Sequence, residues 1–320
     1  MKGSGYFIFL ILILYKIPSF SQPESSSFEI KMISSGKNSP DFNPLKDSLD
    51  RLMISLHKKE SATDFCRKYQ WNEMKYENAV NFLISKNYVR EEKGNFIPTC
   101  MVITQKEGKG LMKKGKFIAK QIASQIIKIK PEITRLYLTT TLSGNFPFDS
   151  ISFFIFSDVL LDSWQIRNVE NLFLNKPRPE RHGKNYYLAY IENVDKSRES
   201  FGIYGNQSGK SFRIYGNNRN NINSKSVNDK LKSLPLIDST DDVILDKMAE
   251  VFKDPLMNTL NKNKSYIEKV YKSTNYLKEI SFEEFFIWWY HFIYTSATNI
   301  LSAKKELYLP HEGNFFYRMN

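Results

Sequence analysis

The sequence predicts an α+β fold, and three observations indicate it. Apolar residues recur at helical spacing in 45–86 and again in 242–301. Between them, at 186–217, lie short runs rich in β-branched and aromatic residues, separated by glycine-containing turns. The chain has 320 residues, which is enough to bury one large core or two smaller ones. We therefore expect helices packed on a small sheet.

The composition excludes three classes of protein. Hydrophobic residues make up 41% and charged residues 25% of the chain, so it is too polar for a multi-span membrane protein and too apolar for a wholly disordered one. Two cysteines are too few for a disulfide-dense scaffold. Cys66 and Cys100 could still pair in an oxidising compartment, and the sequence leaves that open.

Residues 1–21 have the pattern of a secretory signal peptide. Lys2 precedes an apolar run at 6–15. Small residues occupy positions −1 and −3 of a cleavage site between Ser21 and Gln22. The run is too short to cross a bilayer as a helix, which takes about 20 apolar residues. We expect cleavage at this point, and a secreted or periplasmic mature chain without a transmembrane span; retention as an anchor is the alternative.

Residues 45–104 carry the pattern of three helices followed by a hairpin. Helically spaced apolar residues fall in three consecutive segments, and two strand-like runs then flank a turn at 92–95. This order, together with the phrase NYVREEKGNFIPT at 87–99, resembles a winged helix-turn-helix module. The preceding segment, 22–44, is rich in Ser, Pro, Asn and Gly, and is predicted to be a flexible linker, with an edge segment as the alternative.

The resemblance implies a helix in the DNA major groove and a wing on phosphate, but the charges argue against a nucleic-acid partner. The predicted third helix, 72–86, carries two lysines and two glutamates, and the wing tip at 90–93 is equally balanced. Groove binding draws most of its affinity from Lys and Arg that neutralise phosphates. We therefore interpret 45–104 as a packing or protein-contact unit. A membrane-anchored winged-helix regulator is an alternative.

Residues 105–130 predict a basic amphipathic helix. The segment 106–130 holds eight lysines and one glutamate, while Leu111, Ile118 and Ile122 share one helical face. Lysine is better suited to diffuse attraction by an anionic surface than to bidentate recognition of a single anionic group. We expect this helix to contact an anionic envelope surface or a protein partner, and the alternative is a merely solvated face. The candidate contact residues are Lys109, Lys113, Lys114, Lys116 and Lys120.

A second candidate for anion binding is the basic segment 176–184. Its two prolines exclude a helix and predict an extended loop. Arg178, Arg181 and Lys184 are expected to be exposed there, where an arginine could clamp a phosphate or a carboxylate.

Residues 105–320 are predicted to form one mixed domain. The β-branched segment 133–141 predicts a strand, and 153–174 predicts a helix. Three β runs in 186–217, two of which end in the phrase IYGN, predict an antiparallel meander. The meander should pack on several helices.

The last third of the chain, 242–301, is predicted to be helical. Ser281 and Glu284 have capping-box spacing at the start of its last helix. That helix contains the segment FFIWWYHFIY, which is too uniformly apolar to have an exposed face. We expect it to be the central core element.

Three residues are candidates for catalysis. Asp158 and Asp162 lie one helical turn apart and could hold a metal or share a proton, and His291 could be a general base. The chain has no common catalytic or nucleotide-binding motif and no cysteine and histidine cluster at zinc spacing. We therefore expect no cofactor and no metal site. An envelope-polymer hydrolase that uses these three residues is the alternative.

The sequence thus predicts an exported, non-catalytic protein of the cell envelope or the extracellular space. Its net charge is +12, and cleavage of the signal peptide would remove two lysines and no acid. A strongly basic exported protein is expected to meet anionic surfaces. Charge alone does not choose between phospholipid headgroups, wall polymers and nucleic acid, although the balanced third helix disfavours the last.

Overall fold

The computed structural model describes residues 27–193, 199–208, 211–219, 222 and 224–319. It confirms the α+β class, with 58% helix, 16% strand and several small sheets. The predicted signal peptide and its cleavage point lie outside the described residues. Within these ranges, every helix is too short or too polar to cross a membrane.

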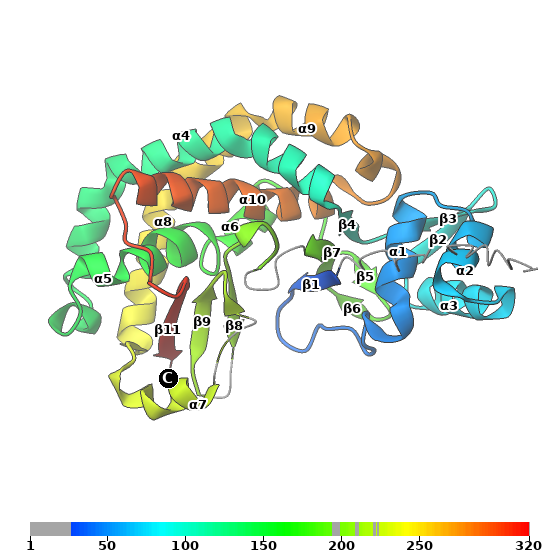
Figure 1. The fold of residues 1–320 in the computed structure, drawn as a ribbon. Coiled ribbons are helices and arrows are strands. Elements are labelled where there is room, and N and C mark those ends of the chain that lie inside the picture. The colour runs from blue at the N-terminus through cyan, green and yellow to red at the C-terminus, as the bar shows by residue number, and fades with distance from the viewer. Residues whose placement is uncertain (1–26, 194–198, 209–210, 220–221, 223, 320) are drawn as a thin grey trace, which may run out of the picture.

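Two long helices form the centre of the molecule (Figure 1). Helix α4 spans Gln105–Tyr137, helix α10 spans Phe282–Ala303, and the two pack along each other. They can approach closely because Gly115 of α4 has no side chain: a Cβ there would lie 2.9 Å from Ile293. The FFIWWYHFIY segment of α10 is buried throughout, as predicted.

Helix α4 is longer than the sequence pattern predicted. The segment 133–141, which was expected to form a strand, continues α4 to Tyr137 although Pro131 lies inside the helix. Ile133 and Tyr137 are both buried, and they stand one helical turn apart. Isoleucine and tyrosine favour strands locally, but here both side chains pack in the core from a helix. The tertiary packing of α4 therefore outweighs their local strand propensity.

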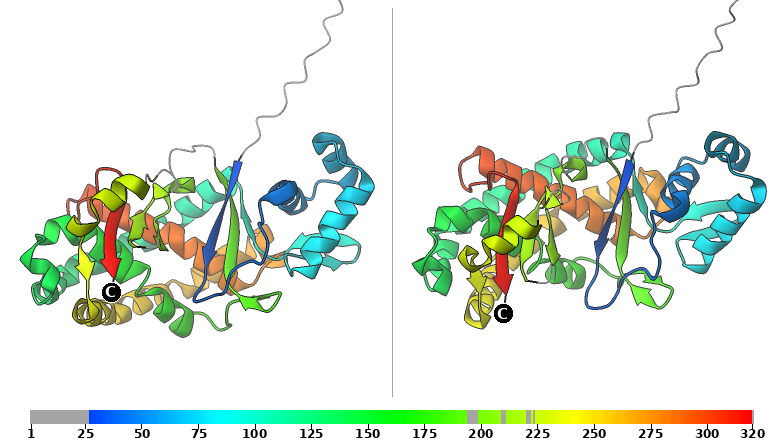
Figure 2. Two further views of the ribbon diagram at one scale, coloured as in Figure 1. Left: turned by 90° about the horizontal axis from the view of Figure 1, so that it is seen from below. Right: turned by 60° about the horizontal axis from the view of Figure 1, so that its bottom comes forward.

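Three short helices and a hairpin follow one another in the predicted order at one end of the molecule (Figure 2). Helices α2 and α3 begin where the side chains of Ser61 and Asn72 accept hydrogen bonds from backbone N–H groups three residues later. The elements are α1 (Leu49–His57), α2 (Ala62–Tyr69), α3 (Glu73–Ser85), β2 (Val89–Glu92) and β3 (Asn95–Pro98).

The prediction of a flexible linker over 22–44 is wrong for β1, Ser27–Ile33, which is an edge strand, in agreement with the alternative prediction. This strand pairs antiparallel with β7, Tyr187–Asn193, and β4, Met101–Ile103, pairs parallel with β7 on its other side. The serine-rich composition of the segment hid an alternating strand pattern, FEIKMI.

The β1–β7–β4 sheet separates two hydrophobic cores. Ala189 and Ile191 of β7 belong to the large core around α10. Leu188 and Tyr190 point to the other face and join a smaller core made with α1, α2 and α3. Alternation along one buried strand therefore ties the N-terminal helices to the rest of the chain.

A second sheet has the order β10–β11–β9–β8 and lies at the opposite end of the molecule. The predicted meander over 186–217 is therefore wrong in part, because β7 belongs to the other sheet. Only β8 and β9 form a hairpin, and β9 pairs antiparallel with the C-terminal strand β11. The strands are β8 (Gly205–Ser208), β9 (Arg213–Gly216), β10 (Leu236–Ile237) and β11 (Asn314–Met319).

The single helix predicted over 153–174 is interrupted. It consists of α5 (Phe148–Phe153), a buried π-helical turn η3 (Phe154–Val159) and α6 (Ile166–Leu172). After the π turn, the backbone N–H of Ser163 donates to the side chain of Asp158 instead of continuing the helix.

The helical C-terminal third is confirmed. It contains α8 (Ser239–Lys262) and α9 (Lys264–Lys272) in addition to α10. The remaining short elements are η1 (Lys46–Ser48), η2 (Thr141–Gly144), β5 (Glu180–Arg181), β6 (Lys184–Asn185), η4 (Ser200–Gly202), α7 (Ser224–Asp229), η6 (Leu231–Ser233) and η7 (Asn275–Lys278).

Candidate functional site

Helix α4 presents a row of lysines to the solvent. Lys109, Lys113, Lys116 and Lys120 recur every three or four residues, so they lie on one face of the helix, and all four are exposed. Lys114 is exposed beside this row. The residues predicted for the opposite face, such as Ile118, are buried against α10. The predicted amphipathic basic helix is thus confirmed.

The charge of this row is not compensated by acids in the described part of the chain. The ion pairs that α4 makes there involve other residues: Glu107 with His57, Lys130 with Glu306 and Arg135 with Glu132. None includes a lysine of the row.

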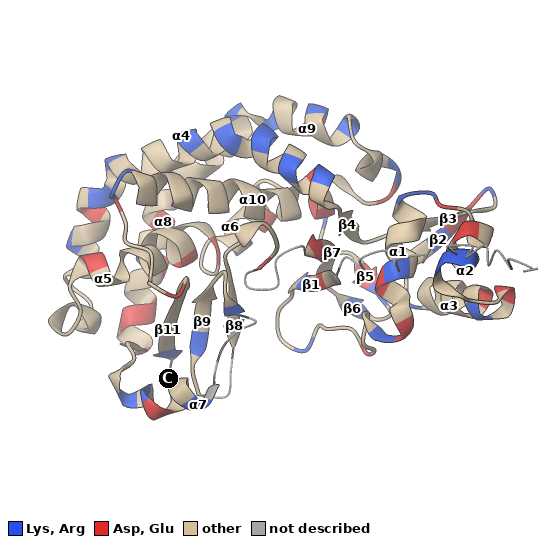
Figure 3. Ribbon diagram, viewed as in Figure 1, with Lys and Arg blue, Asp and Glu red and all other residues tan. Residues whose placement is uncertain are grey.

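Helix α9 lies beside α4 and extends the same surface. The hydroxyl of Tyr266 on α9 donates to the carbonyl of Lys114 at 3.1 Å, and its ring packs edge-on against Phe117. Phe117 is itself 38% exposed. Figure 3 shows lysines along both helices. We call this surface the basic face, and its residues are Lys109, Lys113, Lys114, Lys116, Phe117, Lys120, Lys269 and Lys272.

The segment 176–184 does not form an exposed basic loop. Its end is the β5–β6 hairpin, whose turn residues His182 and Gly183 have φ angles of 49° and 75°, typical of a tight hairpin turn. Arg181 is only 2% exposed, so the prediction that it binds an anionic surface is wrong. Its Nη2 atom lies 2.7 Å from both carboxylate oxygens of Glu284.

The other two candidate residues of this segment, Arg178 and Lys184, also have hydrogen-bond partners. Arg178 donates two hydrogen bonds to Glu170, at 2.7 and 2.9 Å, and Lys184 donates to the carbonyl of Lys37 at 3.4 Å. Glu170 and Glu284 come from distant parts of the chain, which is why the local sequence did not reveal them. The basic face is therefore built by α4 and α9 and not by this segment.

Asp158 and Asp162 are buried, at 0% and 5% exposure. Burial raises the pKa of both carboxyls, and the charge of Asp162 adds to the effect on Asp158. Tyr317 donates to Asp158 at 3.3 Å. Asp158 thus links η3 to β11 through Tyr317. Asp162 links the turn after η3 to α10 through Tyr294.

The neighbours of Asp162 partly offset the effect of burial, because hydrogen bonds with Tyr294 and Asn206 and the charge of Arg219 lower its pKa. The hydroxyl oxygen of Tyr294 lies 3.0 Å from Asp162 Oδ2 and 2.7 Å from the carbonyl oxygen of Tyr204. A tyrosine has one hydroxyl proton, so it cannot donate to both acceptors. If it donates to the carbonyl, a protonated Asp162 can donate to Tyr294, and each group is satisfied.

His291 is fixed by its own helix. Its Nδ1 lies 2.7 Å from the carbonyl oxygen of Ile287, to which a neutral ring can donate. Burial lowers the pKa of His291 to about 4. The ring packs against Trp288 and Tyr294, with ring centres 5.5 and 4.9 Å away. His291 and Asp162 thus both touch Tyr294, and these contacts fix both side chains in the core.

The sequence did not reveal a buried cluster of charges beside β1. Lys31 pairs with Glu199 and lies 3.5 Å from Glu29, and Arg219 Nε lies 3.2 Å from Glu199. Burial lowers the pKa of Lys31 to about 7, with the charge of Arg219 acting in the same direction. The inward-facing Glu29 and Lys31 of the alternating strand are the signal that could have indicated it.

The two cysteines are not paired in the structure. Cys100 is buried, and burial raises the pKa of its thiol to about 12, so it is unreactive. Cys66 is a partly exposed free thiol in α2. The possible disulfide is therefore not formed.

His57 joins α1 to the central helices. Its Nδ1 lies 2.8 Å from Glu279 and its Nε2 lies 2.9 Å from Glu107, which caps the start of α4. Burial alone would lower the pKa of His57, but the hydrogen bonds that its ring donates to the carboxylates of Glu107 and Glu279 raise it to about 9. The imidazole is therefore charged at neutral pH and clamps the N-terminal unit onto the body of the molecule.

We expect His57→Ala to lower the free energy of unfolding by about 1–2 kcal/mol near pH 7. A raised histidine pKa means that this contribution is present at low pH and is lost as the pH rises through about 9. Urea unfolding at several pH values should show the difference from the native protein shrinking toward pH 10, roughly one unit above that pKa. The exposed His311→Ala serves as the control, and a difference independent of pH would show that the clamp is not charged.

Within the described residues, no group of three or more His, Cys, Asp or Glu side chains is placed to hold a metal ion.

Comparisons with protein-family models, with curated proteins and with solved structures found no match to this chain. The function must therefore be argued from its own surface and chemistry.

Proposed function

We propose that this protein is exported, is not an enzyme, and binds the surface of an anionic phospholipid membrane through the basic face. The observation that carries the proposal is the row of exposed lysines on α4 without acidic partners in the described part of the chain. A solvated helix needs some charge for solubility, but the basic face concentrates one sign of charge on one side of the molecule.

The shape of the basic face favours a membrane over a groove or a single anionic group. The lysine row runs along α4 from Lys109 to Lys120, about 17 Å at a rise of roughly 1.5 Å per residue, and α9 extends it sideways. Phe117 is partly exposed in the middle of the lysines. A partly exposed ring among the lysines adds apolar area that the headgroup region of a bilayer can bury.

The expected strength of this attachment is moderate. A lysine near an anionic leaflet contributes about 1 kcal/mol, and this attraction falls off within a Debye length of about 10 Å at 0.1 M salt. The four lysines of the row together could supply a few kcal/mol. Binding should therefore be reversible and strongly dependent on ionic strength.

The proposed export rests on the sequence of residues 1–21. It is tested by the first residue of the protein recovered from its native source. Gln22 would support export, whereas a chain in the cell interior that still begins at Met1 would contradict it and would favour nucleic acid as the anionic partner.

Charge reversal tests the basic face. We expect Lys113→Glu, Lys116→Glu and Lys120→Glu combined to reduce binding to vesicles of phosphatidylcholine and phosphatidylglycerol by at least about tenfold, since each change replaces attraction by repulsion. The measurement is co-sedimentation with the vesicles. Lys93→Glu, Lys230→Glu and Lys247→Glu combined make the matched control, because these lysines are exposed on other elements.

If both triple variants bind vesicles equally, the basic face is not the contact surface. If the native protein does not bind the vesicles but binds a polyanion such as heparin or duplex DNA, the anionic partner is a polymer and the membrane proposal is wrong.

A further inference from the structure

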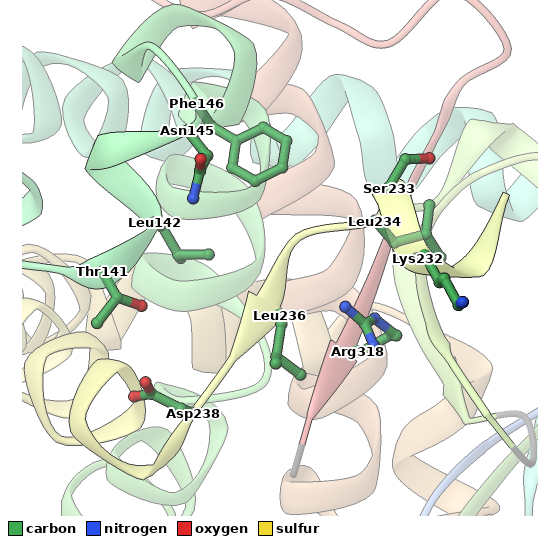
Figure 4. A pocket seen from close by; sticks show the side chains of 10 residues that line it. All are labelled: Thr141, Leu142, Asn145, Phe146, Lys232, Ser233, Leu234, Leu236, Asp238 and Arg318. Carbon is green, nitrogen blue, oxygen red and sulfur yellow. The ribbon is translucent and has the colours of Figure 1, made fainter.

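We propose that the cavity between η2, η6 and β11 binds a small monocarboxylate with an apolar body, and that Arg318 is its anchor. The cavity has a volume of about 480 Å³, which lies in the range of small-molecule sites. Figure 4 shows the side chains that line it. This inference is independent of the basic face.

Three of the six polar residues around the cavity already have partners for their side chains. Thr141 donates to Asp241 through its backbone N–H and its hydroxyl, and Ser233 donates to the carbonyl of Lys230. Asp238 accepts two backbone N–H groups at the start of α8 through a single oxygen, Oδ1. These groups shape the cavity and do not require a ligand.

Arg318 is one of three polar residues of the lining whose side chains have no partner in the described part of the chain. Its Nε is buried and has no hydrogen-bond partner, and its guanidinium forms no ion pair with any described residue. Lys232 and the amide of Asn145 line the same cavity, and their side chains also have no partner in the described ranges. The other nitrogens of the Arg318 guanidinium also have no hydrogen-bond partner in the described residues, and an anionic ligand in the cavity would accept hydrogen bonds from them.

The backbone holds Arg318 in place. Arg318 lies opposite Leu236 in the parallel β10–β11 pair, and its N–H donates to the carbonyl of Pro235 at 2.8 Å. The anchor is thus set on a strand of the second sheet and not on a loop. Such preorganisation reduces the entropy lost when a ligand binds.

The lining defines the class of ligand. Arginine presents a planar fork of donors that matches a carboxylate. Arg318 and Lys232 against Asp238 leave one positive charge, which a monoanion balances and a dianion such as phosphate exceeds. The apolar part of the lining would cover a short chain or ring, and it consists of Leu142, Phe146, Leu234 and Leu236.

Isothermal titration of the full mature chain with hexanoate tests this site, with hexanol as the uncharged analogue and inorganic phosphate as the competing anion. We expect saturable hexanoate binding that hexanol does not reproduce. Arg318→Gln should weaken it at least about tenfold, because a charge-assisted hydrogen bond is lost. Lys230→Gln, an exposed neighbour that does not line the cavity, should leave it unchanged.

Lys232→Gln provides a second variant that does not disturb β11, and it should weaken hexanoate binding by a smaller factor. Absence of saturable hexanoate binding to the native chain would overturn the proposal. So would unchanged affinity in a folded Arg318→Gln variant and in Lys232→Gln, or tighter binding of phosphate than of hexanoate.

Discussion

Replacing Arg181 by methionine is expected to lower the free energy of unfolding by about 3–5 kcal/mol. The substitution leaves the carboxylate of Glu284, which is 1% exposed, without its cation. It also removes the hydrogen bonds that Arg181 donates to the carbonyls of Asn87 and Thr99, at 3.0 and 2.8 Å. Urea unfolding at neutral pH measures the loss.

Two further variants identify the cause. Arg178→Met breaks the more exposed pair with Glu170 and should cost only about 1 kcal/mol or less. Adding Glu284→Gln to Arg181→Met should recover part of the loss, because the buried charge is then gone while an acceptor for the N–H of Leu188 remains. A double variant as unstable as Arg181→Met alone would show that the buried charge is not the reason.

The decrease in unfolding free energy caused by Arg181→Met should also depend on pH. Burial raises the pKa of Glu284 to about 6 even with Arg181 present, and removal of the cation should raise it further. At acid pH the carboxyl is protonated and needs no cation. The difference from the native protein should therefore be larger at neutral pH than at acid pH.

The second large effect is a gain in stability. We expect Asp162→Asn to raise the free energy of unfolding by at least about 2 kcal/mol in mildly alkaline solution, and to change it little in acid. A buried carboxyl with a raised pKa contributes stability below its ordinary pKa, and this contribution is lost as the pH rises through the folded-state value. An asparagine stays neutral, and its amide can still donate to Tyr294.

The difference in unfolding free energy between Asp162→Asn and the native protein reports on this carboxyl alone, because the other titrating groups around it are present in both proteins. Those groups are Asp158, Arg219, Tyr294 and Tyr317. Thermal unfolding across the pH range should show the two curves diverging as the pH rises. If Asp162→Asn destabilises the protein at every pH, Asp162 is ionised in the folded state and its proposed hydrogen-bond arrangement is wrong.

The parts of the fold that depend on local pattern could be predicted from the sequence. The lysine row and the buried face of α4 follow from a spacing of three to four residues, and α10 follows from its uniform apolarity. The capping box predicted at Ser281 and Glu284 is half present. Ser281 accepts from the N–H of Glu284, but the carboxylate of Glu284 turns away to Arg181.

The parts that depend on distant partners could not be predicted. Arg181 has the local surroundings of an exposed loop residue, and only Glu284, 103 positions later, accounts for its burial. Strand β9 was expected to belong to a local meander, but it pairs with β11 at the end of the chain. Nothing near Arg318 in the sequence indicates that η2 and η6 enclose a cavity around it.

The central claim is that the basic face attaches the protein to an anionic bilayer. The most direct test is the affinity of the native mature chain for vesicles with and without phosphatidylglycerol, measured over a range of salt concentrations. We expect binding only to the anionic vesicles, and a steep loss of affinity with rising salt. Equal binding to neutral vesicles, or affinity that does not change with salt, would contradict the claim.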